Sequence, residues 1–171
     1  MLTLILGGAR SGKSGHAQHL AEASGLAVTV IATARAGDAE MAARIARHRD
    51  ERPDHWRTVE EPLALAEALR GSAQPGRFLV VDCLTLWLIN LLEAGEAVFQ
   101  RERTALLEAL LQLPCPVVLV ANEVGLGIIP MGELSRRFVD EAGWLNQALA
   151  SLADEVVFVA ASLPITLKGR L

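Results

Sequence analysis

The chain has few cysteines and no excess of basic residues, and each shortage argues against a class of protein. Its 171 residues include only two cysteines, Cys83 and Cys115, which stand in apolar segments without the spacing of metal ligands. A disulfide scaffold is therefore disfavoured, and we expect two buried free thiols in a reducing compartment. With 16 Lys and Arg against 20 Asp and Glu, the formal net charge is -4. This balance argues against general nucleic-acid binding, which depends on basic residues that neutralise phosphates.

The sequence also lacks a hydrophobic run long enough for a membrane span. Its most apolar later stretch, residues 78–92, is too short and contains Asp82, Thr85 and Asn90. The first residues show no basic segment followed by a long apolar run and a cleavage site, so they do not resemble a secretory signal. We therefore expect a cytoplasmic protein with no membrane span.

Short apolar segments alternate with helical patterns along the whole chain. Hydrophobic residues make up 51% of it, which is enough for a core, and the length predicts a single domain over residues 1–171. The expected strands are residues 2–6, 27–32, 78–82, 117–121 and 156–160. The expected helices are residues 13–23, 39–50, 63–69, 84–93, 101–111 and 133–152. Strands that are almost wholly apolar are typical of parallel sheets, so we predict an α/β fold with helices on both faces.

A glycine-rich loop follows the first expected strand. Its sequence is Gly7-Gly8-Ala9-Arg10-Ser11-Gly12-Lys13-Ser14, which matches the P-loop pattern G-x-x-x-x-G-K-[ST] between a strand and a helix. Glycines let backbone N–H groups wrap around phosphates at a helix N-terminus. We expect Lys13 to reach the β- and γ-phosphates and the Ser14 hydroxyl to bind Mg²⁺. The loop therefore predicts binding of a nucleoside triphosphate.

A P-loop protein also needs a carboxylate to hold the metal ion, usually at the end of a neighbouring buried strand. Residues 78–81 are apolar and lead directly to Asp82, so we assign Asp82 as the second metal ligand. The alternative role is an N-cap for the helix that begins near Leu84. One carboxylate at a strand end can serve both roles.

A basic helical segment forms a second candidate site. Arg44, Arg47, His48 and Arg52 have a spacing that would place them along one helix face. In an acidic chain, such a cluster could bind phosphate, and a neutral imidazole at His48 could attack an α-phosphorus while the arginines stabilise the charge that develops. On spacing alone, however, a charged helix face that carries one histidine is usually just a solvated surface with an inert histidine.

Several segments together resemble one known family. They are the loop 7–14; Ile31-Ala32-Thr33-Ala34; Arg44-Ile45, His48-Arg49, Arg52-Pro53 and Trp56; and Ala121-Asn122-Glu123-Val124-Gly125-Leu126-Gly127-Ile128-Ile129-Pro130. In this order they resemble the bifunctional adenosylcobinamide kinase / adenosylcobinamide-phosphate guanylyltransferase family of cobalamin biosynthesis, over nearly the whole chain. The resemblance implies a RecA-like P-loop NTPase fold and a homotrimer.

The resemblance also implies two reactions. Family members phosphorylate adenosylcobinamide with ATP or GTP, and then transfer GMP from GTP to adenosylcobinamide phosphate, which yields adenosylcobinamide-GDP and pyrophosphate. The second reaction is understood to pass through a GMP-histidine intermediate, and the motif position assigns that histidine to His48. Some relatives carry two adjacent histidines where this chain has Arg47-His48, and His55 is the rival nucleophile. Lys13 is the second expected catalytic residue.

The implied nucleotide-contacting residues lie in the loop and in four later segments. They are Gly7, Gly8, Ala9, Arg10, Ser11, Gly12, Lys13, Ser14, Ala32, Thr33, Ala34, Arg49, Asp50, Glu51, Arg52, Glu60 and Asp82. Of these, Ser14 and Asp82 are the expected Mg²⁺ ligands. The segment 122–127 either shapes the mouth of the site or forms a simple glycine turn. Ser162 stands where the family resemblance leads us to expect glycine.

Two other functions remain open on the sequence, because a P-loop identifies the ligand class and not the reaction. The first is a small-molecule kinase with a single activity, in which His48 is inert. The second is a nucleotide-dependent switch or assembly ATPase that has no small-molecule acceptor.

Overall fold

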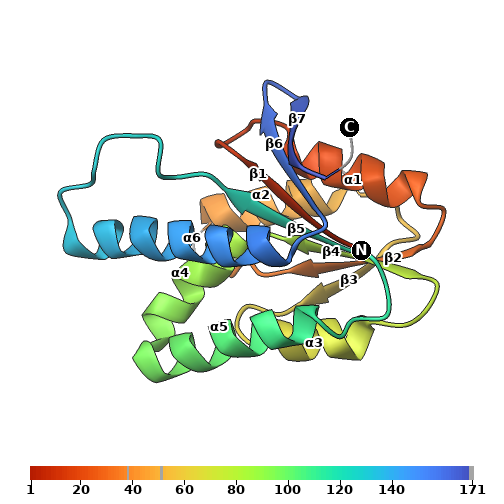
Figure 1. Ribbon diagram of the computed structural model, residues 1–171, viewed down its shortest axis with the longest axis horizontal. Coiled ribbons are helices and arrows are strands. Elements are labelled where there is room, and N and C mark those ends of the chain that lie inside the picture. Colours follow the sequence, from red (N-terminus) through yellow and green to blue (C-terminus); the bar gives the residue numbers. More distant parts are fainter. Residues whose placement is uncertain (38, 51, 170–171) are drawn as a thin grey trace.

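A single seven-stranded sheet forms the centre of the computed structural model (Figure 1). The structure describes residues 1–37, 39–50 and 52–169, without the side chains of residues 40, 41, 44, 45, 48 and 50. The strands are β1 (Leu2–Gly7), β2 (Ala27–Ala32), β3 (Arg57–Glu60), β4 (Arg77–Asp82), β5 (Val117–Asn122), β6 (Glu155–Ala160) and β7 (Leu163–Lys168). Their order in the sheet is β3-β2-β4-β5-β1-β6-β7. All neighbouring strands are parallel except β7, which is antiparallel to β6.

Helices cover both faces of this sheet, as the apolar strands predicted. They are α1 (Lys13–Ala23), α2 (Ala39–Asp50), α3 (Leu65–Ser72), α4 (Leu84–Ala94), α5 (Glu96–Leu110) and α6 (Glu133–Leu152). Successive side chains of a strand point to opposite faces. Within β1, Ile5 therefore packs in the cluster that includes α1, whereas Leu4 and Leu6 pack in the cluster that includes α3 to α6. The mostly parallel sheet with helices on both faces is confirmed.

The structure adds two strands that the apolar pattern of the sequence does not predict. Both β3 and β7 lie at the edges of the sheet, where one side of a strand has no neighbour. β3 has only four residues, with polar residues at three of them, and β7 contains Pro164 and is mostly exposed. Neither strand therefore has the continuous apolar run that marks a buried parallel strand.

One helix begins earlier than predicted. The sequence pattern predicts it over residues 101–111, whereas α5 begins at Glu96, directly after Gly95. Gly95 has a φ of 99°, which ends α4 and turns the chain into α5. The first turn of α5 offers little apolar periodicity, so the helix pattern becomes visible only later in the sequence.

Two further expectations concern membranes and thiols. Within the described ranges, no helix combines the length and the apolar character needed to cross a membrane. Both cysteines are free, and Cys115 is buried as expected, whereas Cys83 is only partly buried.

Candidate active site

A cavity of about 320 Å³ opens at the carboxyl ends of the parallel strands. The register of the sheet makes these ends level, because Ala32 of β2 lies opposite Glu60 of β3 and Asp82 of β4. The residues lining the cavity are Arg10, Ser11, Gly12, Lys13, Ser14, Gly15, Ala32, Ala34, Arg49, Arg52, Thr58, Glu60, Asp82, Cys83, Leu86, Val120 and Asn122. In open parallel sheets, ligands bind at this edge.

The loop between β1 and α1 owes its shape to glycines at two positions. Gly7 has a φ of 154°, and a Cβ there would lie 2.3 Å from the carbonyl oxygen of Val159. Gly12, the N-cap of α1, has a φ of 100°, and a Cβ there would lie 2.7 Å from Ser162 Oγ. Any other residue would be strained and would displace β6 or the turn that follows it. The pattern therefore needs glycine at both ends of the loop.

Lys13 is the first residue of α1, and its side chain turns back toward this loop. Its side chain is buried, and Nζ donates to the carbonyl oxygen of Gly8 at 2.5 Å and to Ser11 Oγ at 3.4 Å. A buried ammonium beside the N-terminus of α1 makes this end of the cavity electropositive. Such a position suits the phosphates of a nucleotide.

Asp82 faces the loop from the end of β4. One of its carboxylate oxygens lies 3.7 Å from a guanidinium nitrogen of Arg52, and the two side chains are only 20% and 14% exposed. Burial lowers the pKa of Arg52, and the nearby Asp82 carboxylate opposes that shift. The Asp82 carboxylate and the Ser14 hydroxyl line the same cavity. Both are hard oxygen donors of the kind that Mg²⁺ prefers, so these residues fit a magnesium ion.

The end of β4 is held in place by a buried hydrogen-bond network. Thr33, which follows β2, donates its hydroxyl to the carbonyl oxygen of Cys83 at 2.6 Å and accepts the backbone N–H of Cys83 at 3.2 Å. Asn90 of α4 donates its amide to the carbonyl oxygens of Thr33 at 2.8 Å and Pro62 at 3.0 Å. Thr33 is fully buried and does not line the cavity, although its neighbours Ala32 and Ala34 do. The hydrogen bonds of Thr33 therefore hold the ends of β2 and β4 in position.

The end of α2 and the residues just after it lie beside the cavity. Arg49 and Arg52 line the cavity, and Arg49 forms an ion pair with Glu60 at the end of β3. Of the other predicted residues in this segment, His48 and Asp50 have side chains outside the described part of the structure, and Glu51 lies outside it entirely.

Most of the remaining predicted residues meet in one place. The structure brings Arg10, Ser11, Gly12, Lys13 and Ser14 together with the strand-end residues and the two arginines. Gly7, Gly8 and Ala9 belong to the same loop but are not among the described residues that line the cavity.

Six lining residues were not among the predicted nucleotide contacts. They are Gly15, Thr58, Cys83, Leu86, Val120 and Asn122. Thr58 was missed because β3 was not foreseen. Cys83 directly follows Asp82 and Leu86 lies four residues after it, so both could have been found from Asp82. Asn122 opens the 122–127 segment, and its backbone N–H donates to Thr85 Oγ1 at 2.7 Å. Burial raises the pKa of the Cys83 thiol, which keeps it protonated at neutral pH.

Comparison with known proteins identifies one family. A family model described as cobinamide kinase / cobinamide phosphate guanyltransferase matches residues 3–167. The bifunctional adenosylcobalamin biosynthesis protein CobP of Pseudomonas aeruginosa is 62% identical over 173 residues, which cover 99% of each chain. The bifunctional adenosylcobalamin biosynthesis protein CobU of Escherichia coli is 41% identical over 98% of this chain and 100% of that protein.

Solved structures with the same architecture are distant in sequence. The RadB recombinase has a TM-score of 0.54 and 17% identity, over 92% of this chain and 73% of that one. A prototypical ATPase from the type III secretion system of pathogenic bacteria has a TM-score of 0.52 and 12% identity, over 96% of this chain and 56% of that one. At such low identity these likenesses concern the fold alone, which is that of the RecA-like P-loop NTPases.

Proposed function

The chain belongs to the cobinamide kinase / cobinamide phosphate guanyltransferase family and is a bifunctional enzyme with both activities, and we propose that one cavity at the P-loop serves both reactions. One observation carries this proposal. Residues 10–14 of the phosphate loop, Asp82, Arg49 of α2 and Arg52 just after that helix line the same cavity. Its volume of about 320 Å³ lies within the range of small-ligand sites. The two rival functions, a kinase with one activity and a switch ATPase, do not fit a bifunctional family.

In the kinase reaction, the loop holds the triphosphate of ATP or GTP. Lys13 contacts the β- and γ-phosphates, and Ser14 and Asp82 hold Mg²⁺. When bound, the metal ion offsets negative charge on the phosphate oxygens. The hydroxyl oxygen of adenosylcobinamide forms a bond to the γ-phosphorus, the bond from that phosphorus to the bridging oxygen breaks, and a nucleoside diphosphate leaves. The hydroxyl proton is released in the same reaction.

In the guanylyl reaction, His48 is the nucleophile. A neutral imidazole nitrogen forms a bond to the α-phosphorus of GTP, and the α–β phosphoanhydride bond breaks with release of pyrophosphate. A phosphate oxygen of adenosylcobinamide phosphate then attacks the same phosphorus, the P–N bond breaks, and adenosylcobinamide-GDP forms. The presence of Arg49 and Arg52 on the cavity supports this role, because they lie one and four residues from His48 along the chain.

The other proposed nucleotide-binding residues divide into two groups. Backbone groups of Arg10, Ser11 and Gly12 face the phosphates, and Gly7, Gly8 and Ala9 complete the same loop. Ala32, Thr33, Ala34, Arg49, Asp50, Glu51, Arg52 and Glu60 contribute from the strand ends and from the α2 segment. Within the second group, Thr33 acts through the backbone of Cys83.

Labelling with GTP tests the proposed nucleophile. Wild-type protein incubated with Mg²⁺ and GTP labelled at the α-phosphate should retain label that is labile to acid and stable to base, as a phosphoramidate is. His48→Ala should lose the label and all guanylyl transfer, yet it should still phosphorylate adenosylcobinamide. His55→Ala is the matched control, since it removes the rival histidine, and it should keep both activities.

Two results would contradict the histidine mechanism. One is the absence of label on wild-type protein that forms adenosylcobinamide-GDP. The other is an equal loss of both activities in a folded His48→Ala variant, because that outcome would make His48 a structural residue.

We also propose that the enzyme is a cytoplasmic homotrimer. A closed ring of three copies needs two different surfaces on each copy that fit each other. Exposed apolar side chains form two separate surfaces on this chain, which we propose as the contacting pair. The arm surface comprises Leu126, Ile128, Ile129, Met131 and Leu134, and the edge surface comprises Leu163, Ile165 and Leu167 on β7.

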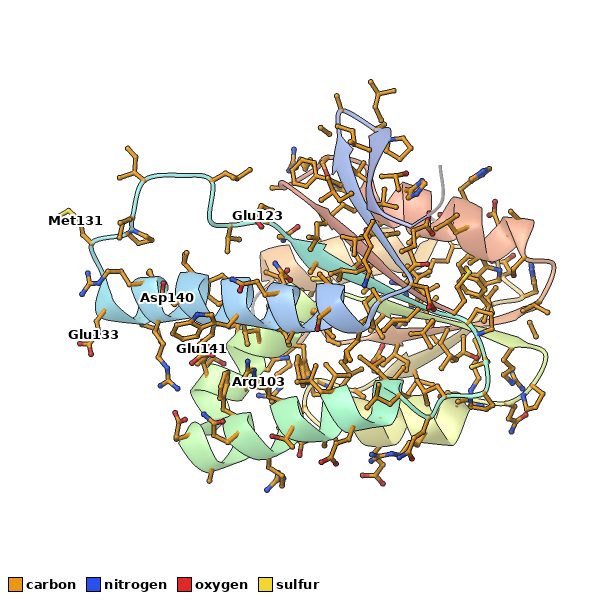
Figure 2. All side chains as sticks on the ribbon, in the orientation of Figure 1. Arg103, Glu123, Met131, Glu133, Asp140 and Glu141 are labelled. Atoms are coloured by element: carbon orange, nitrogen blue, oxygen red, sulfur yellow. The ribbon has the colours of Figure 1, made fainter. Side chains whose placement is uncertain are left out.

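The loop between β5 and α6, which carries most of the arm surface, has a shape that supports a contact between copies. The loop after β5 runs away from the sheet, and Figure 2 shows Met131 at its outer end and Glu133 where α6 begins. Ile128 and Met131 are 98% and 97% exposed. An apolar cluster with this exposure is typical of a surface that another chain covers. We infer that the arm surface of one copy packs on the edge surface of the next.

A further inference from the structure

The turn between β6 and β7 rests directly against the phosphate loop. Ala161 and Ser162 form this two-residue turn, and both have a left-handed backbone with φ of 51° and 64°. This conformation is the one that tight hairpins of antiparallel strands prefer. It directs the backbone N–H of Ser162 to the carbonyl oxygen of Ser11, 2.7 Å away. In Figure 1 the hairpin lies next to the connection between β1 and α1.

The contact is close at both ends of the loop. A Cβ on Gly12 would lie 2.7 Å from Ser162 Oγ and 2.9 Å from Ser162 Cα, and a Cβ on Gly7 would meet the Val159 carbonyl. These separations are shorter than ordinary van der Waals contact, so the loop is seated against β6 and its turn with no space for a side chain.

The hydrogen bond from Ser162 fixes the orientation of one peptide group in the loop. In a trans peptide, the carbonyl of Ser11 and the N–H of Gly12 point in opposite directions. Ser162 holds that carbonyl on the hairpin side, which turns the Gly12 N–H away from the hairpin. Gly12 lines the nucleotide cavity. Backbone N–H groups held in this way make the anion-binding nest of a phosphate loop.

We propose that Ser162 is a positioning residue for the triphosphate, which holds the phosphate loop in its binding shape through its own backbone N–H. The proposal rests on the proposed use of this loop for nucleoside triphosphates. Only the left-handed backbone at Ser162 and its N–H are required. The hydroxyl is not, so a glycine at this position would serve equally well.

Three variants test this role by calorimetric titration with GTP and Mg²⁺. Ser162→Val should raise the Kd for GTP about tenfold, because a β-branched residue disfavours a left-handed backbone and the hydrogen bond to Ser11 is lost. Ser162→Gly keeps both the backbone conformation and the N–H, so its Kd should stay within about twofold of wild type.

Gly76→Val is the matched control for backbone strain. Gly76 has a φ of 83° in the turn before β4, a Cβ there would meet nothing within 4 Å, and it does not line the cavity. This variant should lose stability as Ser162→Val does but keep the wild-type Kd. In steady-state kinetics, Ser162→Val should raise KM for GTP with little change in kcat, because the contact serves the bound nucleotide throughout the reaction.

Three results of the titrations would overturn the proposal. They are a wild-type Kd for GTP in Ser162→Val, a rise of the Kd in Gly76→Val equal to that in Ser162→Val, or a Kd in Ser162→Gly as high as that in Ser162→Val.

Amide exchange in wild-type protein gives a second measurement that needs no variant. GTP should slow exchange of the Ser162 N–H, and unchanged exchange would contradict the role. Failure of wild-type protein to bind GTP would instead refute the proposed function.

Discussion

At the scale of single residues, two buried threonines of the β2 segment differ in what their hydroxyls do. Thr33 bonds to both backbone groups of Cys83, beside the metal-binding candidate Asp82. Thr29 is equally buried within β2, and its hydroxyl has no hydrogen-bond partner among the described residues. A buried hydroxyl stabilises a fold only when it is paired. The two residues therefore have opposite expected responses to removal of the oxygen.

Valine at each position tests this difference, because valine keeps the shape of threonine. Thr33→Val should lower the free energy of unfolding by about 1–3 kcal/mol, since the Cys83 N–H is left without its acceptor. Thr29→Val should be neutral or should raise stability by about 1 kcal/mol. Urea denaturation of both variants measures these changes, and an equal loss of stability in the two would refute the assignment.

The residues that could be found from sequence are those whose signal is local. The loop 7–14 and Asp82 have their pattern within a few neighbouring positions, so their roles were assigned without a structure. Thr33 was assigned from a resemblance, and its contact with Cys83, fifty positions away, could not be foreseen. The same holds for Ser162, whose partner Ser11 is at the other end of the chain.

At the scale of elements, helix α4 ties together the connections that follow β2 and β3. Its buried Asn90 donates one hydrogen bond to each connection, through the carbonyl oxygens of Thr33 and Pro62. Trp87, one turn earlier, donates its indole N–H to the carbonyl oxygen of Leu63 at 2.8 Å. Because these connections begin next to the lining residues Ala32, Ala34 and Glu60, α4 helps to position those residues.

Replacing Asn90 should weaken this connection. Asn90→Leu removes both amide donors and leaves two carbonyl groups without partners, so the free energy of unfolding should fall by about 2–4 kcal/mol. Gln100→Leu on α5 is the control, because Gln100 is an exposed amide that pairs only with Glu96 among the described residues. Thermal unfolding compares the two, and a similar Tm in both variants would contradict the role of α4.

The elements themselves could be predicted to different degrees. Buried strands such as β1, β4 and β5 are apolar along nearly their whole length. This pattern predicted the first and last residues of each strand to within a residue or two. Edge strands β3 and β7 are stabilised on one side only and carry mixed residues, so no local pattern marks them. Thr58, which lines the cavity, was missed for this reason.

At the scale of the whole molecule, the proposed assembly rests on two separated apolar surfaces. The arm surface and the edge surface come from different parts of the chain, and neither packs against the core. A heterologous contact between them would close a ring of copies. The sequence indicated a homotrimer only through its resemblance to a family, because exposure of apolar residues cannot be read from composition.

A charged side chain introduced on the arm surface should dissociate the proposed trimer. Wild-type protein should sediment as three copies of the 18.3-kDa chain, and Ile128→Glu should shift it to a single copy, because the buried carboxylate would lack a partner. Leu111→Glu is the control, since Leu111 is 69% exposed but belongs to neither surface. A monomeric wild type, or an Ile128→Glu variant that stays trimeric, would contradict the proposed contact.

The central claim is that the phosphate loop and His48 act on the same molecule of GTP. A crystal structure of the enzyme with a GTP analogue that cannot be cleaved between its α- and β-phosphates tests this most directly. We predict that the triphosphate lies along residues 7–14, with a His48 ring nitrogen about 3–3.5 Å from the α-phosphorus. A nucleotide bound in the cavity with His48 out of reach of that phosphorus in every copy would contradict the account.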